Sequence, residues 1–366
     1  MANPANAAVK LCFNYYSTFT DAGIGEDYHT SSSASSRTAR GLWVKVTQNG
    51  TTKFEDYTDL NGCTGSLSQL NTGSISYKAY ASAKVSRGNK IWLNDDASGT
   101  RGYHSGTKTI SSTGTTNITF TPSSNYRNQF DILAAASYAV YRNSGAKSDK
   151  LYRIRSNTTS SSGSHFKTSG HNGNPTVYMY SGHSNKKFVI VHEVGHMLTY
   201  FNKGGRWEND CGFKSTSCPA AAGAHSMASK ENNSCAASEG FAHFYAAATY
   251  NNASQDDCKM HYYKNEFGND SSPIVDCETS NGAFVTKYVE NSCVGSPTGY
   301  STELDYMRSF WDVLTDGTNN PCVNDIVTWG SNANWGKSNA TTRLNSTASG
   351  TIGNKWPTAR DNNGLN

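Results

Sequence analysis

Apolar and polar residues alternate along short runs in the N-terminal part of the chain and follow a helical period further along. The alternating runs lie between about residues 7 and 122 and are bounded by Gly, Asn, Ser and Asp, as expected of β-strands. They are VKLCFNYY, GLWVKVT, SISYKAYASA, KIWLND and TNITF. Asn49-Gly50 follows the second run and suits the positive φ angles of a type I′ hairpin turn. The pattern predicts an all-β, antiparallel sandwich-like N-terminal domain over residues 1–124.

Helical periodicity begins after the polar stretch TPSSN at residues 121–125, where we expect the domain boundary. The pattern then predicts helices at about 128–145, 186–202, 234–250 and 302–314, a strand at 175–180 and a short apolar run at 322–329. These elements predict an α+β domain over residues 125–330. The segment 331–366 is polar and rich in Gly and Asn, and we expect a few strands or a loosely ordered tail.

The helix predicted at 186–202 contains His192, Glu193 and His196 in the sequence HEVGH, an H-E-x-x-H motif. Histidines four residues apart lie one turn apart on one helix face, so both imidazoles can reach a single ion. Zinc accepts neutral imidazole, and a catalytic zinc site adds a third protein ligand and an open position for water. Glu193 is the expected general base, because it can take a proton from a water molecule whose pKa the metal lowers.

The third ligand must come from another part of the chain. A third histidine shortly after the motif is excluded, because Thr199 and Asn202 occupy the positions of the Gly and His of the longer H-E-x-x-H-x-x-G-x-x-H pattern. The strongest candidate is Glu239, in the helix predicted after the capping residue Ser234. Small residues beside it, Gly240 among them, would let this helix approach the first one closely. The competing candidates are Glu208, Asp210 and Glu231.

With these motifs, residues of about 125–330 resemble the gluzincins, zinc metallopeptidases in which a Glu from a second helix joins H-E-x-x-H. The resemblance implies that His192, His196 and Glu239 bind the metal and that Glu193 is the base. His243 stands four residues after Glu239, where this group often has an acidic residue that steadies a ligand histidine. It could hydrogen-bond to a ligand histidine and so orient the ring of that ligand, or it could be a core histidine with other partners.

The resemblance also implies a substrate and a further catalytic group. A strand that precedes the H-E-x-x-H helix, here at 175–180, is expected at the sheet edge, where an extended peptide can add to it. A donor that stabilises the transition-state oxyanion is expected well downstream of the third ligand, and Tyr306 and Arg308 are the candidates. His165, His171 and His183 flank the strand and are interpreted as loop residues.

The composition restricts the kinds of binding partner and the cellular compartment that we expect for this protein. Only 16% of the residues are charged and the net charge is +4, with no basic run, which argues against nucleic acid as a partner. No stretch of about 20 apolar residues predicts a membrane span. The polar composition and nine cysteines are typical of an exported protein. The opening MANPANAAVK lacks an apolar signal core, and we interpret Met1 as an added start on a mature chain whose leader has been removed.

The cysteines indicate disulfides rather than a metal cluster, because no C-x-x-C pair occurs. Cys12 and Cys63 are the only two in the N-terminal region and are expected to pair. The other seven are an odd number, so one thiol is left over.

Taken together, the sequence predicts a secreted zinc-dependent endopeptidase with one catalytic zinc ion and a β-rich accessory domain. A zinc amidase acting on peptidoglycan or another amide polymer would use the same chemistry. An adhesin or binding protein with a structural metal site is the alternative of another class. The Asp/Asn-rich run at 94–96 could host calcium.

Overall fold

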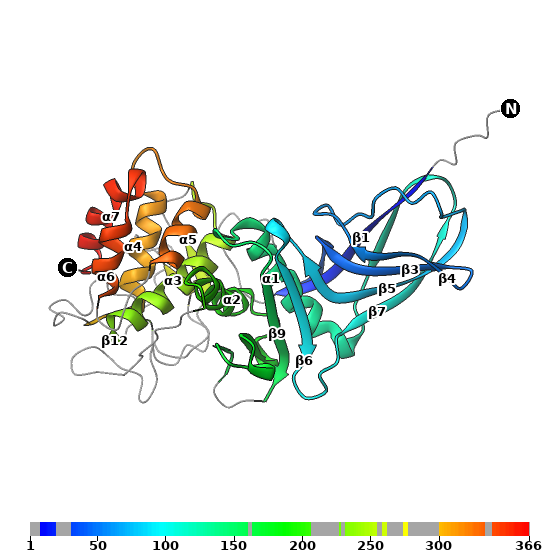
Figure 1. Ribbon diagram of the computed structural model, residues 1–366, viewed down its shortest axis with the longest axis horizontal. Helices are drawn as coiled ribbons and strands as arrows, with labels where there is room; N and C mark the ends of the chain where they lie inside the picture. Colours follow the sequence, from blue (N-terminus) through cyan, green and yellow to red (C-terminus); the bar gives the residue numbers. More distant parts are fainter. Residues whose placement is uncertain are drawn as a thin grey trace.

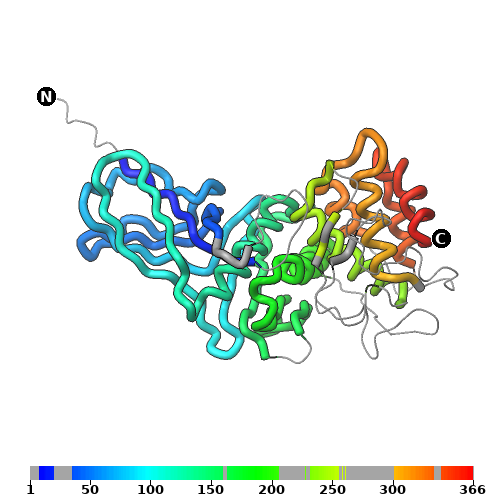
Figure 2. Tube along the Cα trace, turned by 180° about the vertical axis from the view of Figure 1, so that it is seen from behind, coloured from blue at the N-terminus to red at the C-terminus, as the bar shows by residue number. Residues whose placement is uncertain are grey.

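The structure is a computed structural model of residues 1–366. It describes residues 8–19, 31–159, 163–205, 227, 231–254, 258–261, 274–276, 300–333 and 339–365. This part of the chain is mixed α and β, with a β-rich end formed mainly by the N-terminal strands and a helical end formed by the C-terminal helices (Figure 1). Helix α2 (Lys187–Asn202) lies between the two ends in both views (Figure 1 and Figure 2).

Eleven strands lie among the described residues between 9 and 180. They are β1 (Val9–Phe19), β2 (Ser31–Thr38), β3 (Leu42–Gln48), β4 (Thr51–Tyr57), β5 (Gly73–Lys84), β6 (Lys90–Asp95), β7 (Tyr103–Ile110), β8 (Gly114–Phe120), β9 (Leu151–Thr158), β10 (His165–Lys167) and β11 (Thr176–Tyr180). The short strands further along are β12 (Glu231–Asn232), β13 (Lys259–His261), β14 (Ile274–Asp276) and β15 (Tyr300–Ser301).

Seven α-helices lie in the described part of the chain. They are α1 (Arg127–Arg142), α2 (Lys187–Asn202), α3 (Asn233–Tyr250), α4 (Glu303–Thr315), α5 (Val323–Asn332), α6 (Ala340–Thr347) and α7 (Gly350–Asn362). The five helical or apolar segments predicted from residue 128 to residue 329 correspond to α1 to α5. None of the helices within these ranges combines the length and the apolar character that crossing a bilayer would require.

The β-rich end consists of two facing sheets. One has the strand order β2-β1-β8, and the other has the order β10-β11-β9-β6-β5-β3-β4 with β7 also paired to β5. Alternate residues of β1 are buried, and the ring of Phe13 meets that of Tyr77 of β5 with centroids 5.6 Å apart. All five predicted strands are present, and Asn49 (φ 52°) and Gly50 (φ 75°) form the predicted turn between β3 and β4. The purely antiparallel arrangement was wrong, because β1 pairs with β8 in parallel.

The larger sheet continues past the predicted domain boundary. Strand β6 pairs in parallel with β9, from Lys90 opposite Leu151 to Asp95 opposite Ser156. Strand β9 then pairs with β11, and β11 pairs with the three-residue strand β10. The prediction that the strand at 175–180 forms the sheet edge was therefore wrong, since β10 covers it and is the outermost strand at this end among the described residues.

The C-terminal segment is helical, which corrects the expectation of strands or a loosely ordered tail. Ile352 and Trp356 stand four residues apart and lie on one face of α7, so a few apolar residues at helical spacing are enough to fix the helix. The ring of Trp356 is buried against Phe310 of α4 at 5.7 Å and against Trp329 of α5 at 5.0 Å. These contacts attach residues 340–362 to the helical core.

The predicted disulfide between Cys12 and Cys63 is present and joins residues 51 apart in the sequence. Cys235 and Cys258 are also disulfide-bonded. Cys322 is a free, exposed thiol among the described cysteines, whereas Cys211, Cys218, Cys277 and Cys293 lie outside the described residues.

We expect the double variant Cys12→Ser/Cys63→Ser to unfold with a free energy lower by about 4 kcal/mol, because a loop of this length loses its constraint on the unfolded chain. Urea denaturation followed by fluorescence measures the change. Cys322→Ser is the control and should shift the free energy of unfolding by less than about 0.5 kcal/mol, as for other exposed positions. Equal losses in the two proteins would contradict the expectation.

Candidate metal centre

Helix α2 is buried on nearly all sides, as expected of a helix whose apolar residues surround its axis. His192, Glu193 and His196 lie in this buried stretch. Helix α3 crosses α2 at Gly195, where an added Cβ would lie 3.2 Å from the Cα of Ala242. The two small residues therefore let the helices approach closely enough for their side chains to share a site.

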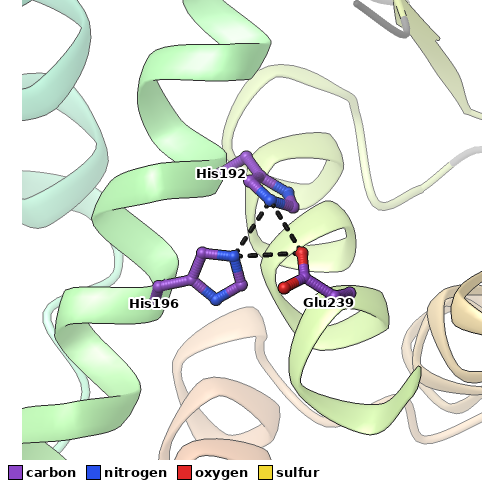
Figure 3. A group of neighbouring side chains, drawn as sticks. All are labelled: His192, His196 and Glu239. Carbon is purple, nitrogen blue, oxygen red and sulfur yellow. Dashed lines mark hydrogen bonds and ion pairs between the residues drawn. The ribbon is translucent and has the colours of Figure 1, made fainter. Parts of the chain in front are cut away.

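Three side-chain atoms converge at this crossing, and they come from residues that the sequence singled out. His192 Nε2 and His196 Nε2 are 3.0 Å apart, and each lies 3.1 Å from Oε2 of Glu239 (Figure 3). All three side chains are buried. No other set of three His, Cys, Asp or Glu side chains in the described ranges is close enough to share an ion.

These separations suit the donor set of a metal ion. Zinc bonds of about 2.0–2.2 Å in tetrahedral geometry place ligand atoms about 3.3 Å apart, so the observed triangle needs to expand by only a few tenths of an ångström. Burial, together with the neighbouring His243 and His196, lowers the pKa of His192 to about 3. His192 is therefore neutral at physiological pH, which is the form that binds a metal. The three residues could hold a metal ion.

His243 contacts the ring of His192 at Nδ1, the ring nitrogen that does not face Glu239. Its Nδ1 lies 3.2 Å from Nδ1 of His192, and its Nε2 lies 3.0 Å from Oε2 of Glu303. Glu303 is the first residue of α4 and was not singled out from the sequence. An acidic residue in a first helical turn already has a local explanation, because it complements the helix dipole. Nothing in the sequence relates it to a histidine 60 residues earlier.

The competing third ligands do not join this cluster within the described residues. Glu231 is buried in β12 and is not a member of the group of potential ligands. Glu208 and Asp210 lie outside the described residues. Asp95, in the run considered for calcium, accepts hydrogen bonds from the backbone N–H of Ser98 and from Asn157 Nδ2, so its carboxylate is used to hold the turn after β6.

The histidines that flank β11 are also engaged elsewhere. His165 lies in β10, which corrects its interpretation as a loop residue, and its ring stacks on that of Tyr178. His171 lies against Arg155, and His183 Nδ1 is 3.0 Å from the hydroxyl of Ser164.

Tyr306 does not lie with the three ligands. Its side chain is fully buried, and its hydroxyl is 2.7 Å from Oγ1 of Thr341 in α6. Burial raises the pKa of the Tyr306 phenol, and hydrogen bonds from neighbours that include Asn233 oppose that rise. Asn233 begins α3, so the Tyr306 hydroxyl lies beside the start of that helix. Its enclosure disfavours the interpretation of Tyr306 as a transition-state donor, and Arg308 is buried as well.

One protein-family model matches the part of the chain that contains the candidate metal centre. Residues 137–273 match the family model of the Mycolysin C-terminal domain, a range that includes α2 and α3 and ends before α4. The match supports a metallopeptidase-related protein that acts on a protein substrate.

Two further comparisons support no conclusion about the fold or the function. No curated protein matches the chain. Among solved structures, 5-hydroxyisourate hydrolase from Klebsiella pneumoniae aligns over 31% of this chain and 90% of its own, with 11% identity and a TM-score of 0.17. At this TM-score the likeness indicates neither a shared fold nor a shared function.

We expect Glu239→Ala to weaken zinc binding by more than about 100-fold, since loss of a ligand should exceed the 10–100-fold effect of outer-shell changes. Zinc content after dialysis against a chelator measures it, with the melting temperature of the metal-free protein as a check on folding. Glu231→Gln is the matched control, a buried acid outside the cluster, and should retain zinc. Loss of zinc in the control alone would make Glu231 the ligand, and retention in both would point to Glu208 or Asp210.

We expect Tyr306→Phe to lower the free energy of unfolding by about 0.5–1.5 kcal/mol, because the hydrogen bond to Thr341 is lost. Turnover should change by less than about threefold, whereas loss of an oxyanion donor costs about 10²–10³. Thr341→Val removes the same hydrogen bond from the other side and should give a similar loss of stability. A hundredfold fall in turnover for Tyr306→Phe alone would restore the tyrosine as the donor.

Proposed function

We propose that this protein is a secreted zinc-dependent endopeptidase with a zincin-like catalytic core built on α2 and α3. The observation that carries the proposal is the convergence of His192 Nε2, His196 Nε2 and Glu239 Oε2 within 3.1 Å of one another, beside Glu193. Two histidines and a carboxylate are a donor set of catalytic zinc, which keeps a position open for water. A structural zinc site, by contrast, is usually closed by four protein ligands.

Each residue has a defined part in the proposed reaction. His192 and His196 would hold the ion from α2, and Glu239 would hold it from α3. When bound, zinc lowers the pKa of a coordinated water molecule and polarises the substrate carbonyl. Glu193 would accept a proton from the attacking water at its carboxylate and would return a proton to the amine that leaves as the peptide C–N bond breaks.

An extended peptide is the proposed substrate. An edge strand offers unpaired N–H and C=O groups to which such a peptide can add. At this end of the larger sheet the edge is β10, which contacts α2 together with β11. The peptide would therefore pair with β10 rather than with β11.

Secretion is supported by the chemistry of the cysteines. Cys12, Cys63, Cys235 and Cys258 are disulfide-bonded, and disulfides persist mainly in oxidising compartments. The β-rich N-terminal part serves as the accessory module of the enzyme in this proposal.

The decisive variant is Glu193→Gln, which keeps the size of the side chain and removes its basicity. We expect one zinc per chain in both the parent and the variant, with hydrolysis of a mixed unfolded-protein substrate by the parent only. Elemental analysis and the release of new amino termini measure the two quantities.

Other outcomes separate the remaining functions. Equal hydrolysis by parent and variant would exclude Glu193 as the base. Zinc without proteolysis, but with release of amines from peptidoglycan, would indicate the amidase. Zinc without either activity would favour a binding protein with a structural site. Absence of zinc in the parent would refute the proposal.

A further inference from the structure

A buried row of three side chains connects the candidate metal centre with the start of α4. His192 Nδ1 is 3.2 Å from His243 Nδ1, and His243 Nε2 is 3.0 Å from Glu303 Oε2. The side chains of His243 and Glu303 are only 2% and 1% exposed, so bulk water does not compete for these contacts. The row runs from a ligand on α2, across α3, to a carboxylate on α4.

Metal binding would fix where the protons of this row lie. A neutral His192 that binds an ion through Nε2 carries its proton on Nδ1. That N–H donates to Nδ1 of His243, which must then be an acceptor. A neutral His243 with a bare Nδ1 carries its proton on Nε2, and this N–H donates to Glu303. One arrangement of protons satisfies both contacts and leaves the metal-binding nitrogen free.

We propose that Glu303 is a positioning residue of the metal centre that acts on His192 through His243. This inference rests on the proposed zinc site. Ligand histidines commonly donate their second N–H directly to a carboxylate, which fixes the tautomer and the ring orientation and raises the basicity of the ligand. In this protein the carboxylate of Glu303 contacts His243 rather than the ligand His192. His243 lies between them and transmits the effect of the carboxylate on the orientation and basicity of His192.

The packing of α3 and α4 holds Glu303 in place. At Gly240 an added Cβ would lie 2.3 Å from the carbonyl oxygen of Glu303 and 2.5 Å from the Cβ of Tyr306, so only glycine permits this approach. Thr302 caps α4 by accepting a hydrogen bond from the backbone N–H of Asp305 at 3.2 Å, which fixes where the helix begins. His243 follows Glu239 by one turn, so α3 presents the ligand and the transmitting residue on one face.

The test compares the affinity for Zn²⁺ alone, by competition with a chromophoric chelator, in the parent and in Glu303→Ala. We expect the variant to bind zinc about 10–100-fold more weakly. Asp305→Asn is the matched control, a buried acid on the same turn of α4 that hydrogen-bonds to Thr302. It should bind zinc as the parent does.

A second substitution separates positioning from mere packing. In Asp the carboxylate oxygens are bonded to Cγ, as Nδ1 is in His, so His243→Asp puts an acceptor where His243 Nδ1 now lies. The double variant Glu303→Ala/His243→Asp should therefore recover most of the zinc affinity, because His192 again donates to a carboxylate. A role of Glu303 confined to packing predicts no recovery.

Glu303→Gln provides the same comparison if the Ala variant does not fold, since its amide oxygen still accepts from His243 without the charge. Its zinc affinity should be below that of the parent. Parent-like zinc affinity in the Glu303 variants that fold, or no recovery with His243→Asp, would overturn the inference. A parent that binds no zinc would refute the proposed function itself, whereas a zinc-binding, proteolytic parent with unaffected Glu303 variants would refute only the role of Glu303.

Discussion

The site depends on how closely α3 can approach the helices on either side of it. The Cα of Ala242 faces Gly195 of α2, and Gly240 faces the backbone of Glu303 in α4. A side chain at Gly240 would overlap with a carbonyl oxygen, an atom that cannot rotate away as a flexible side chain can. These two crossings set the distances between helices, and the distances between ligand atoms follow from them.

Such packing buries many polar atoms, and their burial has to be compensated. A buried polar group without a partner destabilises the fold, and a buried charge does so more strongly. Here Glu239 lies against two histidines, and Glu303 lies against a third. The histidines also contact one another, His192 with both His196 and His243. The contacts that bring the potential metal ligands together therefore also offset part of the free-energy cost of burying these polar side chains among the helices.

The sequence predicted the parts of the site that local spacing determines. Four-residue spacing placed His192 and His196 on one face, and the small residues around Glu239 indicated a helix that could approach them. Glu303 could not be found in this way, because its link to His243 spans 60 residues and exists only once α3 and α4 have packed. The three-residue strand β10 was missed for a similar reason, since so short a run has no periodicity of its own. The terminal helices α6 and α7 were missed because a few apolar residues in a polar stretch give a weak pattern.

The continuity of the larger sheet ties the β-rich end to the site. Strand β6 forms hydrogen bonds with β9 along its whole length, and β9 in turn supports β11, which packs on α2. Helix α1 strengthens the same connection, because Asp131 accepts a hydrogen bond from the backbone N–H of Thr18 in β1 at 2.9 Å. Removal of residues 1–124 would expose the paired edge of β9 and the buried face of α1. The described strands before residue 124 therefore support the elements that pack on α2, β11 and α1 among them.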